Sequence, residues 1–289
     1  MRVGVVILPE YPWAEAARRW QAVDELGFDH AWTYDHLAWR DLADGPWYGT
    51  VPTLAAAATV TSQIGLGTWV LSPNFRHPVP WARDVMALDD LSGGRFLCGV
   101  GTGATGFDAT VLGRDLLPAA ARMDRLTEFL KLLDLLLTSD HVTHEGAYYT
   151  ARDARTLPGC VRRPRVPLLV AAGGPRGQRL ALRLGDGWIT NGPRDVRSED
   201  EWWSGVTKLA RAIDASRPPD GFWRLLSLDS CPGYSLSSAG RFEDMAGRAA
   251  ELGFTDVIVH FPRADGVYAG REETLEQIAH SRTREGMPQ

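Results

Sequence analysis

Lysine is nearly absent from this sequence. Of its 31 basic residues only Lys131 and Lys208 are lysines, and both lie in stretches with helical periodicity. Aldolases that form a Schiff base need a lysine at the reacting carbonyl, so the sequence disfavours that chemistry. The net charge of −5 also gives no reason to expect the basic face of a nucleic-acid-binding protein. We therefore expect no nucleic-acid partner.

Cysteine is scarce as well, and its three copies are scattered. Cys98, Cys160 and Cys231 form no CxxC pair, which suits reduced thiols in the cytoplasm better than a disulfide framework. No apolar run approaches the roughly 20 residues of a membrane span. The N-terminal run VGVVIL is too short for the apolar core of a signal peptide. We expect a cytoplasmic protein without membrane contact.

Patterns of metal ligands are also missing. His141 and His144 lie three residues apart without a further carboxylate and histidine set, so a surface hairpin explains them better than a metal site. The first apolar run contains no H-x-H, which disfavours a metallohydrolase barrel. We expect no metal.

What the sequence does contain is a regular alternation of apolar, strand-like runs and helical patterns. The eight predicted strands cover 2–8, 28–34, 64–70, 95–100, 166–172, 186–191, 222–230 and 254–261. The eight predicted helices cover 13–26, 52–62, 80–91, 119–138, 176–184, 199–215, 241–251 and 270–282. Such alternation predicts a parallel sheet with helices outside it. Eight units match the (β/α)8 TIM barrel, with an open doubly wound sheet as the alternative.

One stretch interrupts this alternation. Residues 139–166 are too long for a simple loop, and we interpret them as an insertion between helix 4 and strand 5 that contains a short hairpin. No low-complexity segment or linker marks a domain boundary. We therefore predict that residues 1–289 form a single barrel domain.

Two glycine-rich loops follow predicted strands. GTGATG at 101–106 matches the letters G-x-G-x-x-G, but the dinucleotide fingerprint needs a helix that opens within the motif. The next clear helix is predicted only from Ala119, so we reject a dinucleotide site. AAGGP at 171–175 leads directly into a predicted helix, whose N-terminus suits a phosphate. A tight turn without a ligand is the alternative.

Chemistry in a barrel gathers where strands end, and polar residues occur at these positions. Asp35 and His36 form an acid–base pair at the end of the second predicted strand. A histidine beside a carboxylate can exchange a proton near neutral pH. His36 is therefore the candidate catalytic residue, and a histidine that merely caps the barrel rim is the alternative.

Four motifs follow one another in an order typical of one family. They are GFDHAWTYDHL (27–37), IGLGTWVLSPNFRHP (64–78), LDDLSGGRFLCGVGTG (88–103) and the pair AAGGP and GDGWIT (171–190). With these motifs the chain resembles the bacterial luciferase-like monooxygenase superfamily, and within it the oxidoreductases that depend on the deazaflavin coenzyme F420. The resemblance covers nearly the whole chain.

The resemblance implies a barrel that holds the cofactor ring at the C-terminal ends of its strands. A non-prolyl cis peptide between Trp69 and Val70, in a bulge of the third strand, would lie behind the ring, and His36 would lie beside the reacting carbon. The implied cofactor-binding residues are Asp35, Trp69, Val70, Ser72, Gly101, Thr102, Gly103, Ala172, Gly173 and Gly174. Asp35 and Ser72 would contact the ring, and residues 172–174 the phosphate.

One departure from the family pattern bears on the substrate. Sugar-phosphate dehydrogenases of this family carry a glutamate directly after GTG, where this chain has Ala104. Phe107 follows at a position where a polar residue is usual. Together with Trp39 and Trp69, it predicts an apolar or aromatic substrate, and His260 and Arg263 could meet a polar or anionic group of it. The candidate substrate residues are therefore Trp39, Phe107, His260 and Arg263.

These observations predict an oxidoreductase that transfers a hydride between F420 and a small organic substrate. An FMN-dependent luciferase-like monooxygenase is the first alternative. A catalytically idle flavin-binding protein on the same fold is the second, although the pair Asp35 and His36 argues against it. The resemblance also implies a homodimer.

Overall fold

A closed barrel of parallel strands forms the centre of the computed structural model, which describes residues 1–285. Its eight strands are β1 (Arg2–Val6), β2 (His30–Thr33), β3 (Gly65–Thr68), β4 (Phe96–Gly101), β7 (Leu168–Ala171), β8 (Gly187–Thr190), β9 (Trp223–Ser227) and β10 (Asp256–His260). Strand β1 pairs in parallel with both β2 and β10, which closes the ring. The predicted (β/α)8 barrel is thereby confirmed, and the open sheet is excluded.

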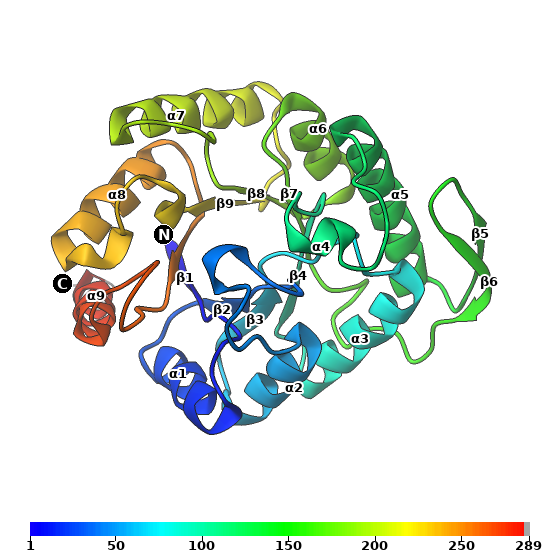
Figure 1. Ribbon diagram of the computed structural model, residues 1–289, viewed down its shortest axis with the longest axis horizontal. Helices are drawn as coiled ribbons and strands as arrows, with labels where there is room; N and C mark the ends of the chain where they lie inside the picture. The colour runs from blue at the N-terminus through cyan, green and yellow to red at the C-terminus, as the bar shows by residue number, and fades with distance from the viewer. Residues whose placement is uncertain (286–289) are drawn as a thin grey trace.

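Helices surround the barrel on all sides (Figure 1). They are α1 (Trp13–Glu25), α2 (Thr50–Val60), α3 (Pro78–Leu91), α5 (Ala119–Thr138), α6 (Pro175–Leu184), α7 (Glu199–Ala215), α8 (Ala239–Glu251) and α9 (Glu272–Glu285). Local sequence sets their ends. Ser198 and Ser238 cap α7 and α8 by accepting backbone N–H groups. Gly27, at φ +73°, follows the end of α1, as its position in the sequence predicts.

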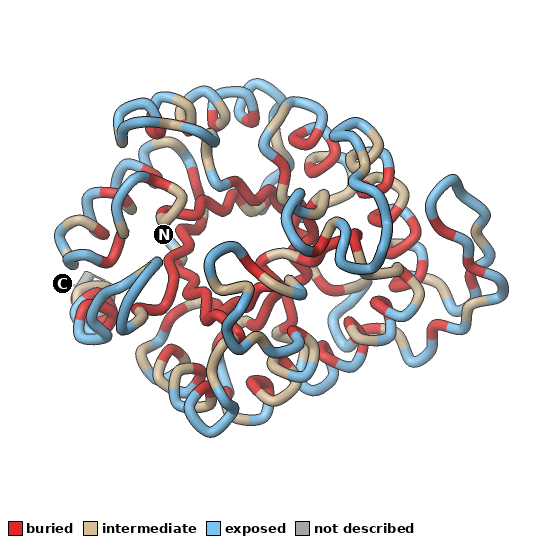
Figure 2. The backbone as a smooth tube through the Cα atoms, in the orientation of Figure 1, coloured by how far each residue is buried: buried red, intermediate tan, exposed pale blue. Residues whose placement is uncertain are grey.

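The strands are buried on both faces, because apolar side chains fill the barrel and also the layer between barrel and helices. In Figure 2 the buried residues form a ring at the centre, and exposed residues follow the outer sides of the helices. The interior of the barrel is packed with Val6, Leu8, Trp32, Tyr34, Trp39, Trp69, Leu97, Leu169, Ile189, Leu225 and Ile258.

Between α5 and β7 the chain forms an antiparallel hairpin of β5 (His141–Glu145) and β6 (Thr150–Arg155). This is the hairpin predicted within 139–166, and it projects from the edge of the molecule beside α5 (Figure 1). The Glu128 carboxylate of α5 accepts the backbone N–H groups of the turn residues Ala147, Tyr148 and Tyr149. These hydrogen bonds hold the turn against the helix.

One prediction about the chain after β4 was wrong. A short helix, α4 (Phe107–Thr110), begins directly after the GTGATG loop, where no helix was expected before Ala119. A single turn carries no hydrophobic periodicity, so the sequence pattern does not reveal it. The dinucleotide interpretation still fails, because β4 belongs to a closed barrel and not to an open sheet with a switch point.

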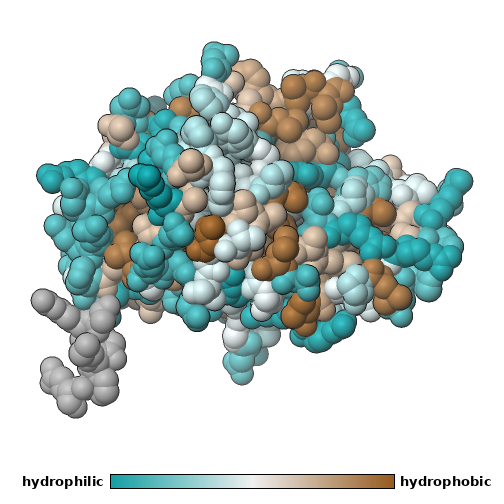
Figure 3. All heavy atoms as spheres, turned by 90° about the horizontal axis from the view of Figure 1, so that it is seen from below, coloured by the Kyte–Doolittle hydropathy of each residue, from teal (hydrophilic) through white to brown (hydrophobic). Residues whose placement is uncertain are grey.

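The surface mixes residues of both kinds: on the face shown in Figure 3, hydrophobic residues lie in separate groups among hydrophilic ones. Within residues 1–285, no helix combines the length and the apolar character that crossing a membrane requires. Cys98, Cys160 and Cys231 are free and buried, as predicted for reduced thiols. Burial raises the pKa of the Cys98 thiol to about 12.

The ladder between β3 and β4 contains a bulge at Trp69–Val70. Gly67 lies opposite Leu97, and Leu71 lies opposite Val100. Three residues on the first strand therefore face two on the second, which is the pattern of a bulge. The peptide bond between Trp69 and Val70 is cis, so this prediction is confirmed.

Two glycines of β4 leave room for the bulge. A Cβ atom at Gly101 would lie 2.7 Å from Cγ2 of Val70. A Cβ atom at Gly99 would lie 2.1 Å from the carbonyl oxygen of Thr68 and 3.0 Å from Cγ1 of Val70. Because the Thr68 oxygen belongs to the backbone, it cannot move aside without distorting β3.

We expect Gly99→Ala to lower the free energy of unfolding by about 1–3 kcal/mol, since the added methyl group overpacks the interior of the barrel. Urea denaturation followed by circular dichroism measures this change. Gly247→Ala is the control: it lies in α8 with no atom within 4 Å of the new Cβ, and alanine favours a helix over glycine by up to about 1 kcal/mol. A Gly99→Ala protein as stable as the wild type would contradict this account of the bulge.

Candidate active site

Parallel strands end on the same edge of a sheet, so the loops after β2, β3 and β4 meet at one end of the barrel. We call this end the mouth. In Figure 1 the segment that follows β2, drawn in blue, and α4 both lie over the barrel. The residues selected from the sequence are spread over these loops and the loops after β7 and β10.

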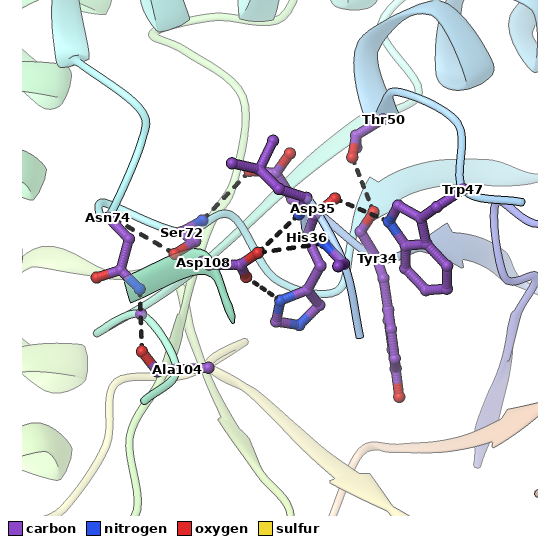
Figure 4. A network of polar contacts seen from close by, with 12 residues as sticks. Tyr34, Asp35, His36, Trp47, Thr50, Ser72, Asn74, Ala104 and Asp108 are labelled. Atoms are coloured by element: carbon purple, nitrogen blue, oxygen red, sulfur yellow. Dashed lines mark hydrogen bonds and ion pairs between the residues drawn. The ribbon is translucent and has the colours of Figure 1, made fainter. Parts of the chain in front are cut away.

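His36 lies at the mouth and is held by a buried carboxylate. Its Nδ1 atom is hydrogen-bonded to Oδ2 of Asp108 in α4, and the other oxygen of Asp108 accepts the backbone N–H of Leu37 at 2.7 Å. A carboxylate accepts hydrogen bonds, so Nδ1 is the donor and Nε2 is free to accept a proton. The Trp47 indole N–H donates to the His36 carbonyl oxygen at 2.8 Å. Figure 4 shows these groups converging on the loop after β2.

Asp35 points into the protein and is buried, with a relative exposure of 1%. Its two oxygens accept hydrogen bonds from Nη2 and Nε of Arg76 at 2.7 and 3.2 Å, and the Ser72 backbone N–H donates to Oδ2 at 3.3 Å. Burial opposes the charge of Arg76, but Asp35 outweighs it and raises the pKa of the guanidinium. The ion pair ties the loop after β3 to the end of β2. The ring contacts implied for Asp35 and Ser72 stay predictions.

The glycine loop after β4 is fastened by Asn74. The Asn74 side-chain amide donates to the carbonyl oxygen of Ala104 at 2.9 Å (Figure 4), and Nη2 of Arg125 donates to Asn74 Oδ1 at 2.5 Å and to the Thr102 carbonyl oxygen at 3.4 Å. Gly103 has φ +84°, and a Cβ atom there would lie 2.5 Å from Asn74 Oδ1. Only glycine fits this position.

The loop after β7 presents its backbone to open space. A Cβ atom at Gly173 or Gly174 would meet no atom within 4 Å, while Ala172 is buried and its carbonyl oxygen accepts the Trp188 indole N–H at 2.7 Å. Helix α6 starts at Pro175, so its first-turn amides have no partner inside the helix and form the positive end of its dipole. This loop fits an anionic group such as a phosphate.

The three aromatic candidates lie in two environments. Trp39 and Trp69 are buried in the interior of the barrel, and the Trp39 ring lies edge-on to Tyr34 with centroids 5.1 Å apart. Phe107 is 54% exposed on α4. It is followed by further exposed apolar side chains, which are Val111, Leu112 and Leu116.

The two candidates at the end of β10 are already engaged with protein groups. His260 is 2% exposed, and its ring nitrogens contact the Tyr34 hydroxyl at 2.7 Å and Asp229 at 2.9 Å. The Arg263 guanidinium binds both oxygens of Glu10, at 2.7 and 2.9 Å. Hydrogen bonding to Glu10 raises the pKa of Arg263. Its charge is thus compensated, and the anion contact suggested for it stays a prediction.

Sequence reasoning missed Asp108 and Asp229, the carboxylates that orient the two histidines. Asp108 lies two residues beyond the last glycine of GTGATG, and a carboxylate so close to a strand-end loop is the signal that could have found it. Asp229 comes two residues after β9 ends, a comparable position. Arg76 lies inside the quoted motif SPNFRHP but was given no role. Within residues 1–285 no cluster of three or more His, Cys, Asp or Glu side chains could hold a metal ion.

Comparison with known proteins agrees with this architecture. An F420-dependent glucose-6-phosphate dehydrogenase of Amycolatopsis mediterranei is 34% identical over 250 residues, 77% of this chain and 73% of that protein. One of Microbacterium testaceum is 36% identical over 196 residues, 66% of this chain but only 54% of its own length. The coenzyme F420 dependent tetrahydromethanopterin reductase from Methanopyrus kandleri has the same fold, with a TM-score of 0.74, 18% identity and 96% of each chain covered.

The family model described as luciferase-like monooxygenase matches residues 1–287. This match spans the whole barrel, including the bulge with its cis peptide and the loops of the mouth. The chain is a member of the luciferase-like monooxygenase family.

Proposed function

We propose that this protein is an F420-dependent oxidoreductase that transfers a hydride to or from a small organic substrate. The observation that carries the proposal is the His36–Asp108 pair, which holds a proton-exchanging ring in a fixed orientation at the mouth. The two relatives from Amycolatopsis mediterranei and Microbacterium testaceum are named as F420-dependent dehydrogenases, which supports the choice of cofactor. The resemblance also supports a cytoplasmic homodimer, which we include in the proposal.

The residues of the mouth fit a cofactor with a flat ring and an anionic tail. Gly173 and Gly174, with the N-terminus of α6, would hold a phosphate, since their backbone faces open space. Residues 69–72 and 101–103 would lie against the ring. When bound, F420 supplies the carbon that accepts or donates the hydride. His36 exchanges a proton through Nε2 during turnover, because Asp108 holds the hydrogen on Nδ1.

The substrate that we propose is apolar or aromatic. Ala104 offers no acid after the GTG loop, Phe107 is exposed beside Asp108, and Trp39 and Trp69 line the barrel interior below. Glucose 6-phosphate is the second candidate, because the relatives are named for it. The ion pair of Arg263 with Glu10 weighs against it, since that guanidinium has no uncompensated charge for a phosphate.

We expect the protein to bind F420 and to bind FMN more weakly, in titrations followed by fluorescence without oxygen. Gly173→Asp should weaken F420 binding about tenfold or more, because like charges a few Å apart near a surface repel by ~1–4 kcal/mol. The thermal midpoint should not change, since the new side chain extends into open space. Gly247→Asp in α8 is the matched control and should bind normally. Tight binding of FMN without binding of F420 would instead establish the flavin alternative.

Replacing His36 with alanine should lower turnover about 10²–10⁴-fold, the usual contribution of a general acid or base, with nearly unchanged F420 affinity. Asp108→Asn keeps the shape of the carboxylate but loses its charge, so we expect an intermediate loss. Both are measured from the absorbance change of F420 at saturating substrate. Wild-type turnover in the His36→Ala protein would remove this residue from the mechanism.

A panel of small aromatic alcohols, ketones and enones, together with glucose 6-phosphate, tests the proposed substrate class. We expect kcat/KM for the best aromatic compound to exceed that for glucose 6-phosphate by about 100-fold or more. The charge of Arg263 is compensated by Glu10, and the aromatic side chains of Trp39 and Phe107 cannot solvate a phosphate. Phe107→Glu should narrow this gap. The opposite order in the wild type would favour the sugar phosphate.

A further inference from the structure

A second histidine with a carboxylate partner, His260, lies against Tyr34, which also contacts His36. Asp229, in the short helix η2 (Leu228–Ser230), accepts the backbone N–H of His260 at 2.6 Å and contacts Nδ1 of the same residue at 2.9 Å. The other ring nitrogen, Nε2, lies 2.7 Å from the hydroxyl of Tyr34. We call Asp229, His260 and Tyr34 the Tyr34 relay. All three side chains are buried, with side-chain exposures of 0% and 2% for Asp229 and His260.

The hydrogen bonds of the Tyr34 relay run in one direction. Ser235 donates its backbone N–H and its hydroxyl to Oδ1 of Asp229 at 3.0 and 2.5 Å. The backbone N–H of His260 donates to Oδ2, so both oxygens of the carboxylate accept hydrogen bonds. Asp229 therefore accepts from His260, which places the hydrogen on Nδ1. Nε2 is then an acceptor, and the Tyr34 hydroxyl is its donor.

The surroundings keep this arrangement rigid. The Tyr268 ring stacks on the His260 ring with centroids 3.7 Å apart and an interplanar angle of 10°, and the Tyr234 hydroxyl donates to the His260 carbonyl oxygen at 2.6 Å. Burial, followed by the neighbouring Tyr268, raises the pKa of Tyr34, so the hydroxyl holds its proton at rest. The titratable or charged groups that face the relay from outside are His36, Arg40, Tyr234, Arg263 and Tyr268.

The position of Tyr34 connects the relay to the mouth. Tyr34 directly follows β2 and comes two residues before His36, and the two rings meet edge-on with centroids 5.5 Å apart. The Trp39 ring also meets the Tyr34 ring edge-on, with centroids 5.1 Å apart. A hydroxyl oxygen that donates to a histidine still has lone pairs with which to accept a second proton.

We propose that Tyr34 exchanges the hydroxyl proton of the substrate, and that the reacting group is therefore a carbinol or its carbonyl. This inference rests on the proposed function and specifies its substrate class. Oxidation and reduction at a C–O bond require one proton at the oxygen for each hydride. Ala104 has no ionisable group to provide it, whereas Tyr34 is backed by a histidine and a carboxylate, the arrangement that activates a hydroxyl in hydrolases.

In the direction of oxidation, the O–H bond of the carbinol breaks as its proton passes to the Tyr34 oxygen, while the proton of Tyr34 moves to Nε2 of His260. Asp229 stabilises the resulting imidazolium. The C–H bond breaks with its electron pair as the C=O bond forms, and F420, when bound, would supply the acceptor for this hydride. His36 would take a proton from solvent on Nε2 and give it up to accompany the hydride. The relay returns the proton of the carbinol to solvent, so the proton count balances, and reduction reverses each step.

Tyr34→Phe tests the inference with 1-phenylethanol and F420, and with acetophenone and reduced F420. We expect turnover to fall about 10²–10⁴-fold in both directions, with the Kd for F420 within twofold of the wild type. Tyr149→Phe is the matched control. It makes the same change at a buried tyrosine outside the relay, packed against Phe129 of α5, so it should retain turnover.

The solvent deuterium isotope effect separates this role from a structural one. Asp229→Asn removes the charge that stabilises the imidazolium of His260 during proton transfer, so we expect the proton transfer through Tyr34 to slow and the solvent isotope effect on turnover to rise. A purely structural carboxylate would lower the thermal midpoint and leave the isotope effect unchanged.

A measurement without cofactor or substrate is also decisive. In ¹⁵N NMR spectra of the full chain at pH 8, we expect His260 to carry its hydrogen on Nδ1 and to show an unprotonated, hydrogen-bonded Nε2. A hydrogen on Nε2 would overturn the relay.

The outcomes also separate the two proposals. Failure to bind F420 overturns the proposed function. The relay alone is overturned if the protein binds F420 and Tyr34→Phe keeps full activity. It is also overturned if the protein reduces the C=C bond of cyclohex-2-enone but turns over neither 1-phenylethanol nor acetophenone.

Discussion

A buried carboxylate must have a partner, and this constraint organises the mouth of the barrel. An unpaired charge in the interior is so unfavourable that removing one partner of a buried pair costs about 3–5 kcal/mol. Four acidic groups at this end are each paired with a residue from another loop or strand end. The pairs are Asp35 with Arg76, Asp108 with His36, Asp229 with His260 and Glu10 with Arg263. The first two pairs link the loops after β2, β3 and β4 to one another. The other two pairs link the loops after β1, β9 and β10.

The same pairs decide where positive charge remains. Arg76 and Arg263 are compensated by carboxylates, whereas Arg125 of α5 donates to the neutral oxygens of Asn74 and Thr102. Burial lowers the pKa of Arg125, so an anion nearby would relieve an unfavourable charge. This arginine and the N-terminus of α6 are therefore sources of positive potential at the mouth, where they would receive the anionic tail of a cofactor.

Much of this arrangement follows from the sequence, because it depends on local patterns. The alternation of apolar runs and helices predicts the barrel, and the family resemblance carried by the motif around GTWV implies the cis peptide between Trp69 and Val70. The hydrogen-bond partners of the site residues do not follow from local sequence patterns. Asp108 lies 72 residues from His36, and Glu10 lies 253 residues from Arg263. Such pairs form only when the barrel closes and brings the strand ends together, so no local signal indicates them.

The difference in exposure between the two histidines bears on their division of work. The side chain of His36 is 16% exposed, so its free nitrogen can reach a bound molecule or solvent directly. The side chain of His260 is 2% exposed, and its free nitrogen faces the Tyr34 hydroxyl. A buried base of this kind acts only through the group that covers it, and a hydroxyl can pass on a proton where a phenyl ring cannot. The proposed relay therefore depends on the hydroxyl of Tyr34 and not on its aromatic ring alone.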